Sequence, residues 1–239
     1  MNIALIGYGK MGHAIERIAV GRGHHIGCRI DQDNQHDFDS PDFAAADIAI
    51  EFTTPATAVD NIRRSLDRGV SVVSGTTGWH NRLDEMKAYA EHSGRGLFWT
   101  SNFSIGVNIL FDINRRLAEL MNRYPQYDAS LKEIHHIHKL DAPSGTAVSL
   151  ANDIVNAIER LDTWQLDTHA GHTLTITAER TGEVPGTHIV TYNSPVDTLT
   201  IAHEAKSRDG FALGAVMAAE YMRSRTGFHT MSDLINNQA

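Results

Sequence analysis

Hydrophobic and polar positions follow two alternating patterns over the first hundred residues. Short apolar runs, typical of buried parallel strands, are separated by segments whose apolar residues recur at helical spacing. The predicted strands are 3–6, 25–30, 48–52, 70–74 and 97–99, and the predicted helices lie near 11–21, 56–68 and 80–92. This alternation predicts an α/β fold, a Rossmann-like doubly wound parallel sheet.

The pattern changes after about residue 104. An amphipathic helix is predicted over 106–123, then a strand over 128–136, and a second helix opened by Pro143 and Ser144. The stretches 173–180, 187–193 and 198–206 alternate polar and apolar residues, as strands with one covered face do. A last helix is predicted over 212–222. We therefore expect a second α+β domain with a mixed or antiparallel sheet.

These patterns predict two domains. Residues 1–103, completed by the C-terminal segment 211–239, form the predicted dinucleotide-binding Rossmann domain. Residues 104–210 form the predicted domain for substrate binding and oligomerisation, because three long strands offer more sheet face than one helix can cover.

A glycine motif, G-x-G-x-x-G, lies between the first strand and the first helix. Gly7 permits a tight turn, Gly9 lets the backbone approach a pyrophosphate, and Gly12 allows close packing of helix and strand. The N-terminus of the following helix offers N–H groups and a partial positive charge to phosphates. The motif alone is weak, but its position between strand and helix indicates a dinucleotide site.

Asp31 strengthens that interpretation. It ends the second strand, 19 residues after Gly12, where a carboxylate accepts both ribose hydroxyls of NAD. A plain glycine turn with a surface aspartate is the alternative, and the joint occurrence of these features disfavours it. We expect NADH to be preferred, with NADPH tolerated because Arg29 and Lys10 lie nearby. The loops 52–55 and 75–78 follow later strands and suit a nicotinamide ribose, although each is equally typical of a helix N-cap.

Residues 133–147 carry the most specific chemistry. His135, His136, His138 and Lys139 bring three imidazoles and an ammonium group to the end of a predicted strand. Ser144 is the predicted N-cap of the next helix, whose first amides and the Thr146 hydroxyl suit a carboxylate. Surface histidines and a metal site are the alternatives, but zinc sites rarely use such closely spaced histidines, and we expect no metal. The segment favours a reductase of a small dicarboxylate.

Composition narrows the class of protein. There are 21 basic and 29 acidic residues, a net charge of −8, which argues against a nucleic-acid or anionic-membrane partner. Cys28 is the single cysteine, so an intrachain disulfide is excluded. No apolar run reaches the roughly 18 residues of a membrane span, and no basic region precedes the first strand as in a signal peptide. We expect a cytoplasmic protein.

Residues 133–147 match the signature E-x-H-H-x-x-K-x-D-A-P-S-G-T-A throughout. The glycine motif, F-T before Pro55, G-T-T-G at 75–78, N-F-S-x-G-V-N at 102–108 and G-E-x-P-G-T at 182–187 follow in the same order. Over nearly its whole length the chain resembles the 4-hydroxy-tetrahydrodipicolinate reductase (dihydrodipicolinate reductase) family. The stretch between Asp31 and the third strand is shorter than in longer members.

The resemblance implies NAD(P)H-dependent reduction of (2S,4S)-4-hydroxy-2,3,4,5-tetrahydrodipicolinate to 2,3,4,5-tetrahydrodipicolinate with loss of water, in diaminopimelate and L-lysine biosynthesis. It implies a homotetramer, with His135 and Lys139 as catalytic residues and His136, Gly145 and Thr146 as substrate contacts. The implied cofactor contacts are Gly7, Tyr8, Gly9, Lys10, Met11, Gly12, Asp31, Gly75, Thr76, Thr77, Thr100, Ser101, Asn102 and Phe103. Side chains alternate along a strand, so His135 and His136 can both serve the substrate only if the strand ends before Ile137.

Two rival functions remain open. One is a Rossmann dehydrogenase acting on an amino acid or a semialdehyde, although Cys28 lies in the second strand, which excludes thioester chemistry. The other is a non-catalytic nucleotide sensor. A sensor would keep the glycine loop but would not need His135, Lys139 and the capped helix together.

Overall fold

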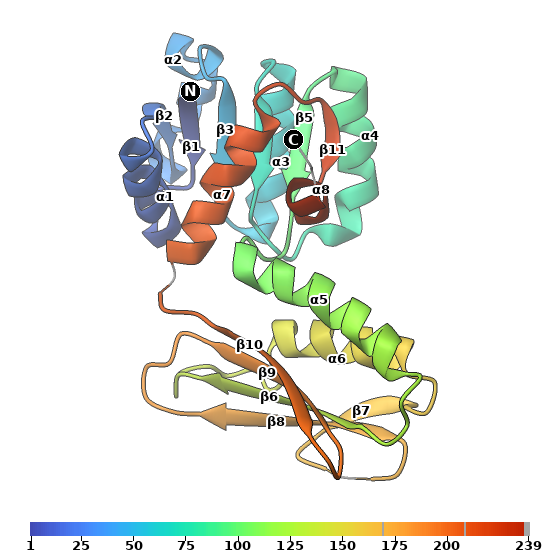
Figure 1. Ribbon diagram of the computed structural model, residues 1–239. Helices are drawn as coiled ribbons and strands as arrows, with labels where there is room; N and C mark the ends of the chain where they lie inside the picture. The colour runs from blue at the N-terminus through green and yellow to red at the C-terminus, as the bar shows by residue number, and fades with distance from the viewer. Residues whose placement is uncertain (169, 208, 237–239) are drawn as a thin grey trace. The chain divides into compact units, whose positions relative to one another are not determined.

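The computed structural model describes residues 1–168, 170–207 and 209–236. It divides into two compact units, one of residues 1–105 with the segment from Asp209 onward and one of residues 106–208 (Figure 1). The predicted segment 211–239 extends to residues 237–239, which lie outside the described residues.

The first unit is built on a six-stranded parallel sheet, which confirms the α/β prediction. The strand order is β11-β5-β4-β3-β1-β2, with bounds β1 Asn2–Ile6, β2 His25–Ile30, β3 Ile48–Glu51, β4 Ser71–Ser74, β5 Gly96–Trp99 and β11 Gly227–His229. Five of these strands were expected from apolar runs. β11 was not, because three residues carry too short a pattern, and the helix α8 (Met231–Asn236) was missed with it. The helix predicted over 212–222 is therefore not the last one.

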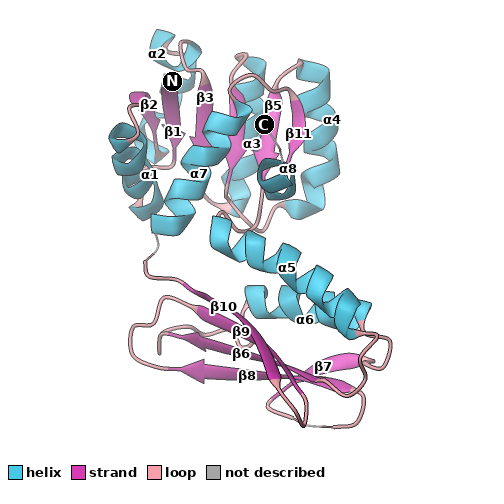
Figure 2. Cartoon of the chain, in the orientation of Figure 1, coloured by secondary structure: helices cyan, strands magenta, loops and turns pink. Residues whose placement is uncertain are grey.

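Helices cover both faces of this sheet (Figure 2). On one face α1 (Lys10–Gly21), α7 (Asp209–Met222) and α8 pack against Ile3, Leu5, Ile48 and Ile50. On the other face α3 (Pro55–Asp67) and α4 (Leu83–Ser93) pack against the alternate strand residues. The remaining elements are the 3₁₀ segments η1 (Gln32–Asp39) and η2 (His80–Arg82) and the short helix α2 (Pro41–Ala44).

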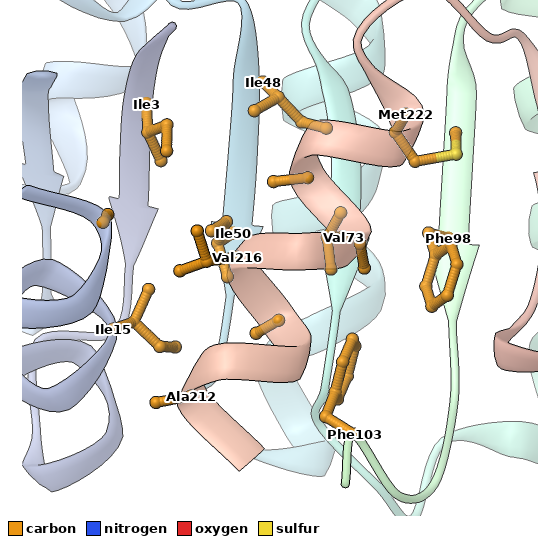
Figure 3. Packing of buried hydrophobic residues seen from close by; sticks show 14 of the residues in the cluster. Ile3, Ile15, Ile48, Ile50, Val73, Phe98, Phe103, Ala212, Val216 and Met222 are labelled. Atoms are coloured by element: carbon orange, nitrogen blue, oxygen red, sulfur yellow. The ribbon is translucent and has the colours of Figure 1, made fainter. Parts of the chain in front are cut away.

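The helix α7 brings the C-terminal part of the chain into the core of the first unit. Its buried residues Ala212, Val216 and Met222 lie across the strands near Ile50, Val73 and Phe98 (Figure 3). The approach is close at Gly214, where an added Cβ would lie 1.7 Å from the carbonyl oxygen of Phe103. Small residues along this helix therefore let it approach the strands and the loop after β5.

The second unit contains a five-stranded sheet in the order β10-β9-β6-β8-β7. The bounds are β6 Asp128–His135, β7 Thr163–Leu166, β8 Thr173–Arg180, β9 Thr187–Asn193 and β10 Thr198–Glu204. The sheet is mixed: β8 runs parallel to β6 and β7, and β9 runs antiparallel to β6 and β10. The four-residue strand β7 was not predicted.

One face of the second sheet is covered by α5 (Ile105–Met121) and α6 (Gly145–Ala157) (Figure 2). Along β6 the covered face passes from an apolar residue, Leu131, to a carboxylate, Glu133, and an imidazole, His135. The apolar core of this unit therefore ends in a polar cluster. Within the described residues of both units, no helix has the length and apolar character needed to cross a membrane.

The close approach at Gly214 yields a stability prediction. Gly214→Ala should destabilise the protein by about 1–3 kcal/mol, because the added methyl group must displace α7 or the loop before α5. Gly210→Ala is the matched control, since an added Cβ at the first turn of the same helix meets no atom within 4 Å. The two variants should separate clearly in urea denaturation, and equal midpoints would show that α7 shifts without cost.

Candidate active site

The glycine loop after β1 has a shape that glycine alone fits at two positions. Gly7 has φ +89°, and an added Cβ would lie 2.1 Å from the carbonyl oxygen of Phe52. An added Cβ at Gly12 would lie 2.5 Å from the carbonyl oxygen of Gly7, so Gly12 lets α1 pack against the loop. At Gly9 nothing lies within 4 Å, which leaves room for a group approaching the backbone. The tight turn at Gly7 and the close packing at Gly12 agree with the sequence prediction, and the pyrophosphate contact at Gly9 stays a prediction.

A cavity of about 360 Å³ opens beside this loop, at the carboxyl ends of β1, β3 and β4. Six of the predicted cofactor contacts line it: Gly9, Lys10, Met11, Gly75, Thr76 and Thr77. Phe52, Thr53 and Pro55 also line it and were not among those residues. Ligands of open parallel sheets bind at this edge, so the cavity is the candidate cofactor site of the first unit.

Asp31 lies beside the glycine loop. Its carboxylate accepts hydrogen bonds from the backbone N–H of Tyr8 at 3.3 Å and of Gln32 at 2.9 Å, and it caps η1. A carboxylate has about four acceptor positions, so these two bonds leave capacity for ribose hydroxyls. The residue therefore fits the adenosine end of a dinucleotide.

Arg29, two residues before Asp31 in the chain, pairs with another carboxylate. Arg29 donates to Glu16 through Nε at 3.0 Å and also through Nη2, and the Tyr8 hydroxyl donates to the same carboxylate. The Arg29 hydrogen bonds outweigh partial burial and lower the pKa of Glu16 to about 2. The guanidinium charge is thus compensated within the protein.

A buried carboxylate, Glu51, lies beneath the cavity and was not predicted. It is fully buried at the end of β3 and accepts from the Ser74 hydroxyl at 2.6 Å, from the Thr76 hydroxyl at 2.8 Å and from the N–H and hydroxyl of Thr53. Burial raises the pKa of Glu51, and these hydrogen bonds oppose the rise. A single charged residue in an otherwise apolar strand was the available signal in the sequence.

Residues 100–103 include a turn fixed by the Thr100 hydroxyl and a side chain, Phe103, that is buried in the core. The Thr100 hydroxyl accepts from the Asn102 N–H at 3.2 Å and donates to the Asn102 carbonyl, which shapes a turn after β5. The Phe103 side chain is buried against Phe52 and Phe98, with ring centroids 5.5 and 5.9 Å away. A cofactor contact by Phe103 would therefore come from its backbone.

In the second unit, β6 ends at His135, as the alternation argument required. The N–H of Thr181 donates to the His135 carbonyl at 2.8 Å, and the N–H of Ile137 donates to the Gly182 carbonyl at 3.1 Å. His135 is buried and His136 is half-buried. The expected break before Ile137 is confirmed, so the two imidazoles are not held to opposite faces of one strand.

The turn after β6 carries Lys139. Its ammonium group lies 2.7 and 2.8 Å from the two carboxylate oxygens of Asp141, and this contact lowers the pKa of Asp141. His138 is exposed and lies 3.0 Å from Glu183. Of the three adjacent imidazoles, His138 is thus directed to a surface carboxylate.

Ser144 is the N-cap of α6, as predicted. Its hydroxyl accepts from the Ala147 N–H at 3.2 Å, and the helix begins at Gly145. Gly145 is exposed and an added Cβ there would meet no atom within 4 Å. The amino end of the helix is therefore open to an anion, which its partial positive charge favours.

A polar network that the sequence did not reveal lies beneath this helix end. Glu133 accepts from the Ser144 N–H at 3.0 Å and from Arg180 Nη2 at 3.0 Å. His188 Nε2 lies 3.2 Å from the Ser144 hydroxyl, and burial lowers the pKa of His188 to about 4. Burial also lowers the pKa of His135, against the pull of Glu133.

Glu133, His135 and His188 bring three metal-ligand atoms within 4.8 Å of one another. Both oxygens of Glu133 already accept hydrogen bonds, and the Arg180 guanidinium lies against one of them. A divalent cation would lie next to this fixed positive charge, which disfavours a metal role for the cluster.

Two family profiles match this chain. The family profile "Dihydrodipicolinate reductase, N-terminus" matches residues 1–103, and "Dihydrodipicolinate reductase, C-terminus" matches residues 106–235. The chain belongs to the dihydrodipicolinate reductase family. As a member of that family it is an oxidoreductase.

Individual relatives agree with this assignment. The 4-hydroxy-tetrahydrodipicolinate reductase of Christiangramia forsetii is 44% identical over 238 residues, which cover 99% of this chain and 98% of the relative. That of Neisseria meningitidis serogroup B is 31% identical over 231 residues, covering 92% and 83%.

Solved structures show the same fold. The dipicolinate-bound dihydrodipicolinate reductase of Paenisporosarcina sp. TG-14 has a TM-score of 0.75 at 21% identity, covering 96% of this chain and 97% of that one. An amine dehydrogenase of Mycobacterium smegmatis has a TM-score of 0.58 at 14% identity, covering 97% and 95%. The fold of both units is thus shared with this amine dehydrogenase, whereas residues 133–147 carry the reductase signature.

Glu51 yields a pH prediction. Because burial raises its folded-state pKa above the ordinary 4.5, the folded protein holds this proton more tightly than the unfolded chain, and stability falls as pH rises from 4.5 through the folded pKa. Glu51→Gln carries no such proton, so its Tm relative to wild type should increase across that window. Glu91→Gln, the same change on an exposed face of α4, is the control. A Tm difference for Glu51→Gln that is constant with pH would contradict the buried charge.

Proposed function

We propose that the chain is a 4-hydroxy-tetrahydrodipicolinate reductase. It reduces (2S,4S)-4-hydroxy-2,3,4,5-tetrahydrodipicolinate to 2,3,4,5-tetrahydrodipicolinate with loss of water, consuming NAD(P)H, in diaminopimelate and L-lysine biosynthesis. The observation that carries the proposal is the segment 133–147, where the end of β6 at His135, the turn with Lys139 and the capped start of α6 follow one another and match the family signature. The relative at 44% identity supports the same reaction.

The second unit binds the substrate in this proposal. One carboxylate is held at the open end of α6 by Gly145 and Thr146, where backbone N–H groups and the helix dipole favour an anion. His136 contacts a carboxylate from the adjoining turn. A relative with dipicolinate bound is consistent with a ligand of this class.

The first unit binds the cofactor. The glycine loop and the amino end of α1 hold the pyrophosphate, Asp31 accepts from the adenosine ribose hydroxyls, and Gly75–Thr77 with Thr100–Phe103 line the nicotinamide end. NADH is preferred, because Asp31 repels a 2′-phosphate and the guanidinium of Arg29, two residues before Asp31, is paired with Glu16. The bound nicotinamide supplies a hydride to C4 of the substrate ring.

The protein's part in the reaction is to manage charge and protons. Loss of water removes a proton from C3 while the 4-hydroxyl is protonated and leaves, which forms a C3–C4 double bond conjugated with the imine. Hydride addition at C4 then leaves an electron-rich enamine that takes a proton at C3. Lys139 is the proton donor, and His135 donates or accepts a proton beside it. Negative charge thus develops next to an ammonium group and an imidazole, which stabilise it electrostatically.

Two further properties belong to the proposal. The protein is a cytoplasmic homotetramer assembled through the second unit's sheet. Support comes from the face of that sheet opposite α5 and α6, which no helix covers among the described residues of the unit.

Turnover of freshly generated substrate tests the proposed function directly. Wild-type protein should oxidise NADH only when the product of dihydrodipicolinate synthase is supplied, and the loss of NADH absorbance measures it. Oxidation with an amino acid or semialdehyde instead would favour a related dehydrogenase. Tight NADH binding without turnover of any of these compounds would favour a nucleotide sensor.

Asp31 should set the cofactor preference. Asp31→Ala should raise the Kd for NADH more than that for NADPH, because the lost carboxylate paired with hydroxyls and repelled phosphate. Fluorescence titration of both cofactors measures this, with Asp33→Ala as a matched control in the same 3₁₀ segment. Equal losses for NADH and NADPH would remove Asp31 from this role.

Lys139 should matter for turnover. Lys139→Ala should lower kcat by about 10²–10⁴-fold, the usual contribution of a positioned acid–base group, while NADH binding is kept. Lys132→Ala is the control, because Lys132 pairs with Glu179 on the same sheet. A Lys139→Ala enzyme with nearly unchanged kcat would exclude it as the proton donor.

The adjacent histidines should give different phenotypes. His135→Gln should mainly lower kcat through loss of a proton-transfer group. His136→Gln should mainly raise KM and weaken pyridine-2,6-dicarboxylate, a planar mimic of the product, through loss of a contact made equally in ground and transition states. Steady-state kinetics and inhibitor titration compare the two, and matching patterns would refute this division of roles.

A further inference from the structure

Glu133 lies where three parts of the proposed substrate site meet. Its side chain is completely buried on β6. A carboxylate removed from water is tolerated only when donors replace its hydration. Those donors come from separate elements: Ser144 at the start of α6, and Arg180 at the end of β8. His135 Nδ1 faces the same carboxylate at 3.5 Å.

Arg180 extends this contact to the turn that carries Lys139. Its Nη2 donates both to Glu133 at 3.0 Å and to the Asp141 carbonyl at 2.7 Å, and its Nε donates to the Lys139 carbonyl at 3.4 Å. The turn has little apolar anchoring, because Ile137 is 60% and Leu140 97% exposed. The Arg180 guanidinium therefore anchors the backbone at Lys139 and Asp141, on both sides of Leu140.

The carboxylate also bears on which imidazole nitrogen of His135 carries its proton. A carboxylate beside Nδ1 favours the tautomer protonated there, which leaves Nε2 for proton exchange. Nε2 lies 3.0 Å from where a Cβ at Gly186 would be, so only glycine leaves that edge of the ring open. The other groups acting on His135 are Arg180, Lys139, His136 and His188, and the His188 ring packs edge-on at 5.2 Å.

We propose that Glu133 is a positioning residue that holds the His135 imidazole, the first turn of α6 and, through Arg180, the Lys139 turn as one unit. The proposal rests on the proposed function, since it assigns those three parts to one substrate site. Glu133 itself transfers no proton to the substrate, because its oxygens are occupied by Ser144 and Arg180.

Kinetics of Glu133→Gln test the role. The amide keeps the shape but loses the charge that Arg180 and His135 face, so kcat should fall by up to about 10²-fold, the cost of displacing a reacting group by about 1 Å. The KM for NADH should not change. Glu179→Gln is the matched control, because it removes an exposed carboxylate from the neighbouring strand, where Glu179 pairs with Lys132. It should behave as wild type.

A pH readout separates positioning from mere stability. Since the charge of Glu133 raises the pKa of His135, Glu133→Gln should move the His135 titration to lower pH. Imidazole NMR measures this in the folded protein without substrate, with His135→Gln identifying the signal. The corresponding limb of the kcat profile should move in the same direction.

The outcomes are distinguishable. If Glu133→Gln is folded, keeps kcat and leaves the His135 titration in place, the positioning role is wrong. If it does not fold, Arg180→Lys decides instead: it keeps a positive charge for Glu133 but loses the planar fork to Lys139 and Asp141, so kcat should fall with the His135 titration retained, and unchanged kcat would overturn the proposal. If wild type fails to turn over substrate, the proposed function fails, while the NMR titration still decides whether Glu133 controls His135.

Discussion

A carboxylate buried at the end of a strand needs a donor for nearly every lone pair, and this requirement organises the functional loops in both units. Glu51 and Glu133 are fully buried, each at or near the carboxyl end of its strand. Their donors lie at the ends of neighbouring strands and in the segments that follow strands: Thr53, Ser74 and Thr76 around the first, Ser144 and Arg180 around the second. Moving either loop would leave a buried charge without partners, which costs several kcal/mol. The apolar cores stabilise the sheets, and the two buried carboxylates hold in place the segments that donate hydrogen bonds to them.

Within each unit, the polar groups therefore fall into two kinds: those at the surface and those buried in internal hydrogen bonds. Asp31, His136 and Lys139 lie exposed or half-buried at the surface, whereas the groups beneath them are buried and used in internal hydrogen bonds. Thr76 illustrates the second kind: it lines the cavity, but its hydroxyl donates to Glu51 and accepts from the Thr53 N–H. A hydroxyl in a sequence motif is therefore not always a hydroxyl offered to the cofactor.

Much of the fold could be predicted because its elements repeat a strong pattern. The parallel strands of the first unit are short apolar runs, and the cap at Ser144 follows from local backbone chemistry. The break before Ile137 was expected because the family resemblance places His135 and His136 near the same substrate. The elements that were missed include β7, β11 and α8. β11 and α8 have three and six residues, too few for periodicity to be recognised, and β7 alternates polar and apolar residues over four positions instead of forming an apolar run. The buried network was missed for another reason. Glu133, Arg180 and His188 are distant in sequence and meet only through the register of β6 with β8 and β9. Predicting their contact requires the strand order, which no local pattern contains.

The place of α7 in the chain bears on how the protein is synthesised. Residues 1–105 emerge from the ribosome first, but the face of their sheet that holds Ile48, Ile50 and Val73 stays without its covering helix until residues 209–222 have been made. The second unit is encoded between these two parts and has its own apolar core, so it can fold before the first unit is complete. The first unit can therefore complete its fold only after the second unit has been synthesised, and until then the uncovered face of its sheet exposes apolar surface during translation.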